Sequence, residues 1–151
     1  PVTLQTFAVA LTGFILGWKY GAISVGIYIL LGTVGVPVFS NFSGGLGALF
    51  GKTGGFIWGF LFLAGFCGVS HITKKKTVIV LSSALGLLIC HLLGAFQFQI
   101  IAGMGFWESA LLVSVPYLLK DAISVFLAYA VGKVVLKSLR AANIGLCEKR
   151  V

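Results

Sequence analysis

Long apolar runs, separated by short polar or glycine-rich stretches, dominate the pattern of this chain. A helix rises about 1.5 Å per residue, so about 20 mainly apolar residues cross a hydrocarbon core of about 30 Å. On that scale the sequence predicts four or five membrane-spanning segments, all of them short. They cover residues 2–18, 22–36, 55–72, 77–94 and a last helix from Pro116 to Leu136 or beyond.

The stretches between these segments carry recognisable breaks. Pro37 ends the second segment because proline removes a backbone donor, and Pro116 suits the first turn of a helix, where that donor has no partner anyway. The lysine run 74–76 separates the third segment from the fourth. Residues 95–115 are apolar but include Gln97, Gln99 and Glu108, so we expect an interfacial or re-entrant piece outside the spanning count.

Composition leads to the same fold class. Of the 151 residues, 59% are hydrophobic and 9% are charged, and the mean hydropathy is +1.11, whereas a soluble domain carries about 25% charged residues. We therefore expect an all-α polytopic membrane helical bundle, with residues 1–151 forming a single membrane-embedded domain. Cys67, Cys90 and Cys147 are too few and too widely spaced for a disulfide framework or a zinc site. The opening at Pro1 predicts a truncated N-terminus with no signal peptide in view.

The formal net charge of +8 is explained by topology rather than by nucleic-acid binding. Basic residues of membrane proteins gather in cytoplasmic loops. If the Lys74 to Lys76 loop is cytoplasmic, alternation of the spans places Lys19 and the basic C-terminus on the same side. The tail then contributes Lys137, Arg140, Lys149 and Arg150. Residues 38–54 with Lys52, residues 95–115 and the start of the last helix lie outside.

Lys120 and Asp121 are the charged pair inside a predicted span. Charges at mid-membrane cost about 2.5–3.5 kcal/mol each on insertion scales, so they usually face a cavity or a partner. One interpretation is an interfacial carboxylate near the helix dipole with a snorkelling lysine. A binding site is favoured because other polar groups fall at the same outer level: Gln5, Asn41, Ser43, Lys52, Thr53, Tyr117, and with them Gln97 and Gln99.

The loop of residues 38–54 is rich in glycine, which allows positive φ angles and close approach of backbone N–H groups to a ligand. A flexible linker is the alternative. Apolar residues interleave the glycines and favour a packed lid instead. They are Phe39, Phe42, Leu46, Leu49 and Phe50.

The sequence gives little support for nucleotide binding, metal binding or catalysis. Gly47 precedes Gly51-Lys52-Thr53 at the wrong spacing for a phosphate-binding P-loop. Cys67 with His71, and Cys90 with His91, fall at opposite membrane levels, so we expect structural roles and no metal site, although His91 alone could reach the outer pocket. Asp121 with His91 is the one possible catalytic dyad, without a third member. We therefore predict no enzyme and no cofactor.

Four stretches resemble the BioY family, the biotin-specific substrate-binding (S) components of energy-coupling-factor (ECF) transporters. They are residues 1–6 (Pro-Val-Thr-Leu-Gln-Thr), residues 19–24 (Lys-Tyr-Gly-Ala-Ile-Ser), residues 35–56 with Pro37, Phe39 and the glycine-rich run, and Pro116-Tyr117 ahead of Lys120-Asp121. Together they extend over nearly the whole chain.

The resemblance implies a six-helix S-component fold, with the first helix missing from this chain, and high-affinity biotin uptake across the cytoplasmic membrane. It implies an ECF transmembrane scaffold and ATPase subunits as partners, with ATP used by those subunits alone. The sequence departs from the family in three places. Lys52 stands where the family usually has proline, and Lys120 stands where glycine is common. Around Ser124 the family would have a lysine, which this sequence lacks.

Biotin's chemistry suits these residues. Asp121 or Asn41 can accept hydrogen bonds from the ureido ring. Lys52, Lys120 or loop N–H groups near Ser43, Gly44 and Gly45 can hold the valerate carboxylate. Apolar walls are expected from Phe39, Phe42 and Tyr117. The alternatives are an S component for thiamin or riboflavin, a small membrane enzyme, and a helix-packing subunit without a ligand.

Overall fold

The computed structural model describes residues 4–142, and in this part of the chain the protein is a bundle of helices. The α-helices are α1 (Gln5–Val34), α2 (Leu46–Leu49), α3 (Gly54–Cys67), α4 (Lys76–Ala102), α5 (Phe106–Val113) and α6 (Val115–Ala141), with short 3-10 turns η1 (Ser40–Phe42) and η2 (Gly68–His71). Four helical segments within these residues are long and apolar enough to cross a membrane. The prediction of a helical membrane bundle is confirmed.

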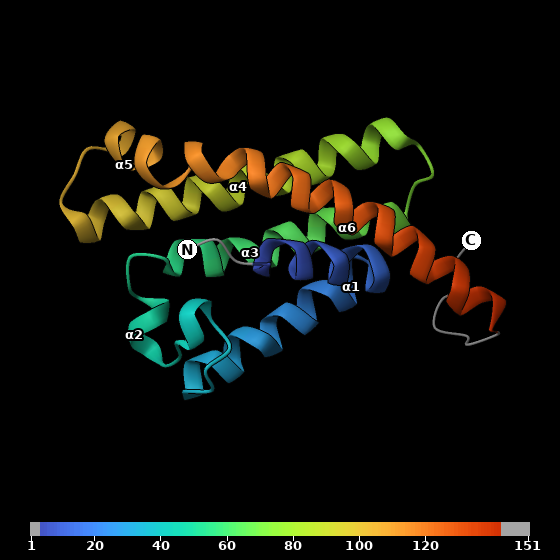
Figure 1. Ribbon diagram of the computed structural model, residues 1–151, viewed down its shortest axis with the longest axis horizontal. Helices are drawn as coiled ribbons and strands as arrows, with labels where there is room; N and C mark the ends of the chain where they lie inside the picture. The colour runs from blue at the N-terminus through green and yellow to red at the C-terminus, as the bar shows by residue number, and fades with distance from the viewer. Residues whose placement is uncertain (1–3, 143–151) are drawn as a thin grey trace.

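The prediction of two separate segments before residue 37 is confirmed within α1. Its 30 residues form two helices joined by a sharp break at Gly17, where φ is 80° and ψ is 177°. The two halves fold back on each other (Figure 1), because the Gln5 amide contacts the Tyr28 hydroxyl and Gly21 lies against Gly13. The break lies two residues before the predicted connection at residues 19–21, since glycine adopts this conformation without a steric penalty. Helix α1 ends two residues earlier than predicted, because Gly35 takes a left-handed conformation (φ 113°) that caps the last turn.

Residues 95–115 also differ from the prediction. Residues 95–102 simply continue α4, and the re-entrant piece is reduced to a short turn and α5. From the sequence, Gln97 indicates the end of the span. In the structure its side-chain amide donates to the backbone carbonyls of Leu49 (3.0 Å) and Gly51 (2.8 Å). Because these partners satisfy the amide, the helix continues past it.

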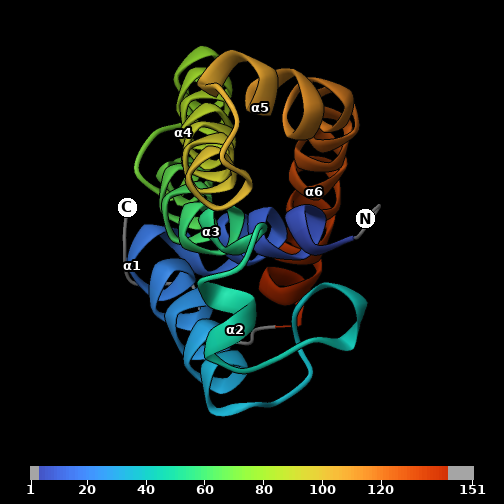
Figure 2. The ribbon, with the colours of Figure 1, turned by 90° about the vertical axis from the view of Figure 1, so that its left-hand side faces the viewer.

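Helix α3 lies at the centre of the bundle and packs against α4 and α1, while α1 also packs against α6 (Figures 1 and 2). The side chains of Leu63, Ala64 and Cys67 on α3 are fully buried. Helices α3 and α4 approach closely at Gly59, where an added Cβ would lie 2.6 Å from the Cα of Cys90. Such small-residue contacts are typical of helix packing in membranes.

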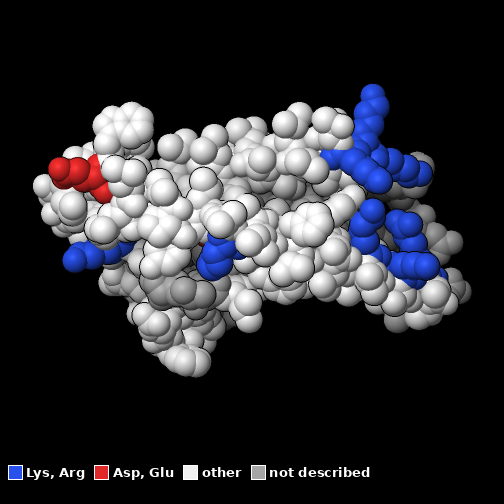
Figure 3. All heavy atoms as spheres, turned by 45° about the horizontal axis from the view of Figure 1, so that its top comes forward, with Lys and Arg blue, Asp and Glu red and all other residues white. Residues whose placement is uncertain are grey.

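The surface of the long helices is apolar. Leu30, Val80 and Phe126 are examples of large side chains that are more than half exposed, as expected for helices whose outer faces contact lipid. Lysine and arginine side chains gather at one end of the molecule, to the right in Figure 3. That end contains the loop before α4 and the last turns of α6, where Lys74 and Lys76 meet Lys137 and Arg140 around one hollow. The predicted tail residues Lys149 and Arg150 lie outside the described residues.

Candidate functional site

Asp121 lies on the inward face of α6. The buried residues of this helix are Asp121, Val125, Ala128 and Gly132, which recur at intervals of three or four and so form one stripe along the helix. The carboxylate therefore points into the bundle, and the residue is 6% exposed. An ionised group so placed needs partners, because an unpaired buried charge is very costly.

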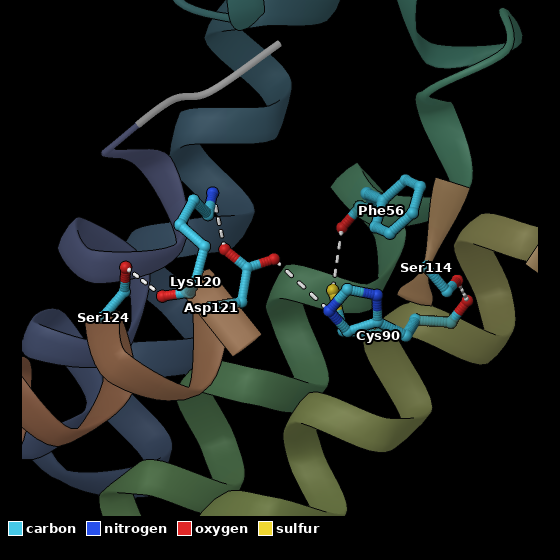
Figure 4. A network of polar contacts seen from close by, with 7 residues as sticks. Phe56, Cys90, Ser114, Lys120, Asp121 and Ser124 are labelled. Atoms are coloured by element: carbon cyan, nitrogen blue, oxygen red, sulfur yellow. Dashed lines mark hydrogen bonds and ion pairs between the residues drawn. The ribbon is translucent and has the colours of Figure 1, made fainter. Parts of the chain in front are cut away.

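Three helices supply those partners. Lys120 Nζ lies 2.6 Å from Asp121 Oδ1, and His91 Nε2 of α4 lies 3.3 Å from Oδ2. The buried Thr6 side chain, in the first turn of α1, also interacts with the carboxylate. Figure 4 shows Lys120 and Asp121 turned toward each other, with Ser124 bonded to the Lys120 carbonyl one turn later on α6 (2.9 Å).

His91, for which the sequence predicts mainly a structural role, is the partner from α4. It is 4% exposed, and its ring meets the ring of Phe56 edge-on, with centroids 5.5 Å apart. Ser114, at the start of α6, donates to the His91 backbone carbonyl (3.2 Å) and ties the two helices together. The sequence indicates this pairing only through the predicted topology, which places His91 and Asp121 at the same outer level of the membrane. The contact itself required the packing of α4 against α6.

The glycine-rich loop is fixed to the first turn of α1. The Gln5 amide contacts the Tyr28 hydroxyl, the Ser40 hydroxyl donates to Gln5 Oε1 (3.0 Å), and the Tyr28 hydroxyl donates to the Val38 carbonyl (3.0 Å). Gln5 is adjacent to Thr6, the partner of Asp121. One helical turn therefore connects the loop to the buried carboxylate.

The loop is packed in its flanks and exposed at its tip. Phe39 and Leu49 are buried in the core, whereas Phe42 is 89% exposed. Asn41 and Phe42 adopt left-handed φ angles of 58° and 54°. Asparagine tolerates this region, but a bulky aromatic residue seldom occupies it. Strain of this kind concentrates at binding sites and switch regions, which draws attention to the tip of the loop.

The structure brings some predicted site residues together and leaves others apart. Asp121 and Lys120 form an ion pair, and among the described residues the carboxylate pairs with Lys120 and His91 rather than with Lys52. Phe39 packs into the core against the ring of Tyr28, with centroids 5.6 Å apart. The remaining predicted residues line the outer surface: Asn41, Phe42, Gly44 and Lys52 are exposed, and Ser43, Gly45 and Tyr117 are half-buried.

A hollow of about 360 Å³ lies elsewhere, toward the basic end of α6. Tyr129, Gly132 and Lys133 line it, and none of the predicted ligand-binding residues does. At the Asp121 end the carboxylate is instead closed over by the side chains of three helices. The candidate site is therefore a buried polar cluster beside an anchored loop.

Comparison with known proteins identifies a family for this chain. Residues 1–141 match the BioY family. A probable biotin transporter BioY of Pyrococcus horikoshii is 35% identical over 133 residues, which cover 88% of this chain and 78% of that protein. A biotin transporter BioY of Thermotoga maritima is 44% identical over 97 residues, and this chain spans 57% of its length.

The fold has a solved counterpart. A crystal structure of the S-component for biotin from an ECF-type ABC transporter superposes with a TM-score of 0.79 at 25% sequence identity. The superposition covers 91% of this chain and 76% of the other. The sequence match, the relatives and the fold all agree, and this chain belongs to the BioY family.

Proposed function

We propose that this chain binds biotin at the Asp121 end of the bundle and serves biotin uptake as the S component of an ECF transporter. The relatives named as biotin transporters and the solved biotin S-component support this function. The observation that carries it is the buried Asp121–Lys120 pair, joined through the first turn of α1 to a strained, anchored loop.

The pair has the chemistry that a ureido ring requires. A ureido group presents an N–H donor next to a carbonyl acceptor, and Asp121 with Lys120 presents an acceptor next to a donor. We assign the ring N–H to Asp121 and the ring carbonyl to the Lys120 ammonium. His91 and Thr6 hold the carboxylate from its other sides. Binding then replaces part of one polar network with another and leaves no buried charge unpaired.

The valerate end of biotin needs a cation or backbone donors and an apolar wall. With Lys120 assigned to the ring, Lys52 of the loop is the cation for the carboxylate, together with N–H groups near Ser43, Gly44 and Gly45. Phe42, exposed at the loop tip, and the half-buried Tyr117 supply apolar surface. Closure of the tip over the ligand would bury Phe42.

The function involves no covalent chemistry. Members of this family and its solved relative are transporter components. We infer that the scaffold and ATPase subunits of an ECF transporter supply the energy and that this chain supplies specificity. By the positive-inside rule, the basic end faces the cytoplasm and the glycine-rich loop faces outward. A site at the outer level must become exposed to the inside for release.

Isothermal titration of the purified protein in detergent tests ligand identity and ligand orientation. Biotin should bind, and thiamin and riboflavin should not. Biotin methyl ester, which lacks the anion, should bind more weakly than biotin to the native protein. Lys52→Gln should weaken biotin and leave the ester unchanged. If thiamin or riboflavin binds more tightly than biotin, biotin is not the ligand. If Lys52→Gln loses equal affinity for biotin and for its ester, Lys52 does not bind the carboxylate.

Uptake of labelled biotin tests the role in transport. Cells that express this chain with a scaffold and ATPase pair should accumulate biotin, and cells with an ATPase lacking its catalytic glutamate should not. Glu108→Gln, which removes an exposed carboxylate on α5, next to the start of α6 (Figure 1), is the matched control for Asp121→Asn. Loss of uptake in the Asp121 variant alone supports the assignment, and equal uptake by both variants contradicts it.

A further inference from the structure

The hollow at the basic end is separate from the Asp121 site. It lies between the stretch from η2 to the start of α4 on one side and the last turns of α6 on the other, and it encloses about 360 Å³. His71 forms part of its wall and is fixed to α1, because its Nε2 lies 2.7 Å from the backbone carbonyl of Phe14. The hollow is therefore bounded by side chains of helices that pack together.

Its rim is strongly positive. Five basic residues line it, namely Lys74, Lys76, Lys133, Lys137 and Arg140. The acidic residues of the described chain are Glu108 and Asp121, and Asp121 is already paired with Lys120 and His91. Several like charges around one cavity repel one another unless an anion lies among them. The rim therefore has the charge of an anion-binding site.

The floor of the hollow has a different character. Phe14, Ile79 and Leu136 line it, and Phe14 and Ile79 are buried. Tyr129 contributes an aromatic wall, with the Lys133 ammonium 4.9 Å from its ring centroid. A cavity with cationic donors at its mouth and hydrocarbon below fits a molecule that is anionic at one end and apolar at the other.

The position of the hollow in the membrane further limits the class of ligand that it can bind. The first turn of α4 and the last turns of α6 are the ends of membrane-spanning helices, so the rim lies at the level of the lipid headgroups. Basic pockets between transmembrane helices at this level bind acidic headgroups. Ser70 and Thr73 also line the hollow and offer hydroxyl donors to phosphate oxygens.

We propose that this hollow is a binding site for an anionic phospholipid, with the phosphate among Lys133, Lys137 and Arg140 and the start of an acyl chain against the apolar floor. The site is independent of biotin recognition, since no residue assigned to biotin lines it. An acidic protein segment fits the charge of the rim but gives no reason for the apolar floor, so the lipid is favoured.

The chain offers a matched pair of variants. Lys133→Gln/Lys137→Gln removes two charges from the rim. Lys19→Gln/Lys75→Gln removes two exposed charges that do not line the hollow. Each pair includes one lysine stacked on an aromatic ring, Lys133 on Tyr129 and Lys19 on Trp18. Net charge and ring contacts are thus changed equally in both.

Thermal unfolding is measured in maltoside micelles with dioleoyl phosphatidylglycerol, dioleoyl phosphatidylcholine or glycerol phosphate. We expect phosphatidylglycerol to raise the midpoint of the native protein and of the control pair by about 2–4 °C, with no rise for Lys133→Gln/Lys137→Gln. A similar rise in both variant pairs overturns the site. A full rise with glycerol phosphate alone overturns the lipid as its source and assigns a free phosphoester.

Native mass spectrometry keeps the test decisive if the rim variant unfolds early. Lys133→Arg/Lys137→Arg preserves the charge and should retain bound phosphatidylglycerol, while Lys133→Gln alone should retain less than Lys19→Gln. Equal retention of phosphatidylglycerol by Lys133→Gln and Lys19→Gln contradicts the proposal. Binding of polyglutamate without binding of phosphatidylglycerol also contradicts it and assigns the rim to an acidic protein segment.

Discussion

The two ends of α6 differ in how their charged side chains are surrounded. At its first turns, Asp121 is 6% exposed and is enclosed by Lys120, His91 and Thr6, so each charge has a partner within the bundle. At its last turns, Lys133, Lys137 and Arg140 surround a hollow to which the described chain contributes no carboxylate. One end is closed and balanced, and the other is open and positive.

The difference shows how one membrane helix can carry two kinds of recognition. A balanced, buried pair discriminates strongly, because a ligand must reproduce every hydrogen bond that it displaces. A cluster of exposed cations discriminates mainly by charge, because long side chains adapt to many anions. We therefore expect the Asp121 end to determine which vitamin binds, and the basic end to determine how the protein sits in the bilayer.

Removal of the carboxylate should have the largest effect. Asp121→Ala deletes the charged acceptor for the ligand and the carboxylate that pairs with Lys120 and His91, and loss of a hydrogen bond to a charged group costs up to about 3 kcal/mol of binding free energy. We expect biotin affinity to fall on the order of 100-fold by isothermal titration. Glu108→Ala removes an exposed carboxylate and should leave affinity unchanged. Equal affinities for the two variants would show that the closed end does not bind the vitamin.

The contact between α3 and α4 is the next most sensitive feature. Gly59→Ala would place a Cβ 2.6 Å from the Cα of Cys90, next to His91, and overpacking of this kind costs about 1–3 kcal/mol. Thermal unfolding in detergent should show the loss. Gly65→Ala is the control, because no atom lies within 4 Å of an added Cβ on the same helix. Comparable midpoints for both variants would mean that the helices can separate without cost.

Anchoring of the loop should have a moderate effect. Gln97→Ala removes the donor to Leu49 and Gly51, and loss of such partly buried hydrogen bonds costs about 1–2 kcal/mol. We expect faster release of labelled biotin and faster protease cleavage in the loop of residues 38–54. Gln99→Ala, two residues along the same helix, is the control. Unchanged release and cleavage in the Gln97 variant would separate loop anchoring from binding.

The smallest effect on biotin should come from the basic end. Lys133→Gln/Lys137→Gln alters residues that line the hollow and none that we assign to the vitamin. Biotin affinity in a fixed detergent should therefore stay within about twofold. A tenfold loss of biotin affinity measured by titration would show that the two ends of α6 are coupled and do not act independently.

Much of the architecture follows from the sequence because its causes are local. Apolar length fixes the spans, and Pro116 and the lysine run at 74–76 mark helix starts. The clustering of basic residues at one end follows from the alternation of spans. The break in α1 is expected from the sequence, but its exact residue is not, because Gly17 and Gly21 both permit a break and packing against Gly68 and His71 places it at Gly17.

Some residues of the candidate site are likewise evident from the sequence, and others only from the structure. Lys120 and Asp121 are evident from the sequence because charges inside a span are costly. His91 as their partner is not, since it lies 30 positions earlier on a helix whose rotation is set by its neighbours. The roles of Gln5 and Gln97 as anchors likewise depend on which carbonyls the loop presents to them.

By itself, the sequence determined that this protein is a helical membrane bundle, which charges it keeps inside, and which family it resembles. Apolar length and the cost of intramembrane charge act residue by residue and need no tertiary information. The tertiary structure decided which groups satisfy those charges and where the chain leaves cations around an open hollow. Those outcomes depend on the rotation and close approach of helices, which packing between distant residues sets.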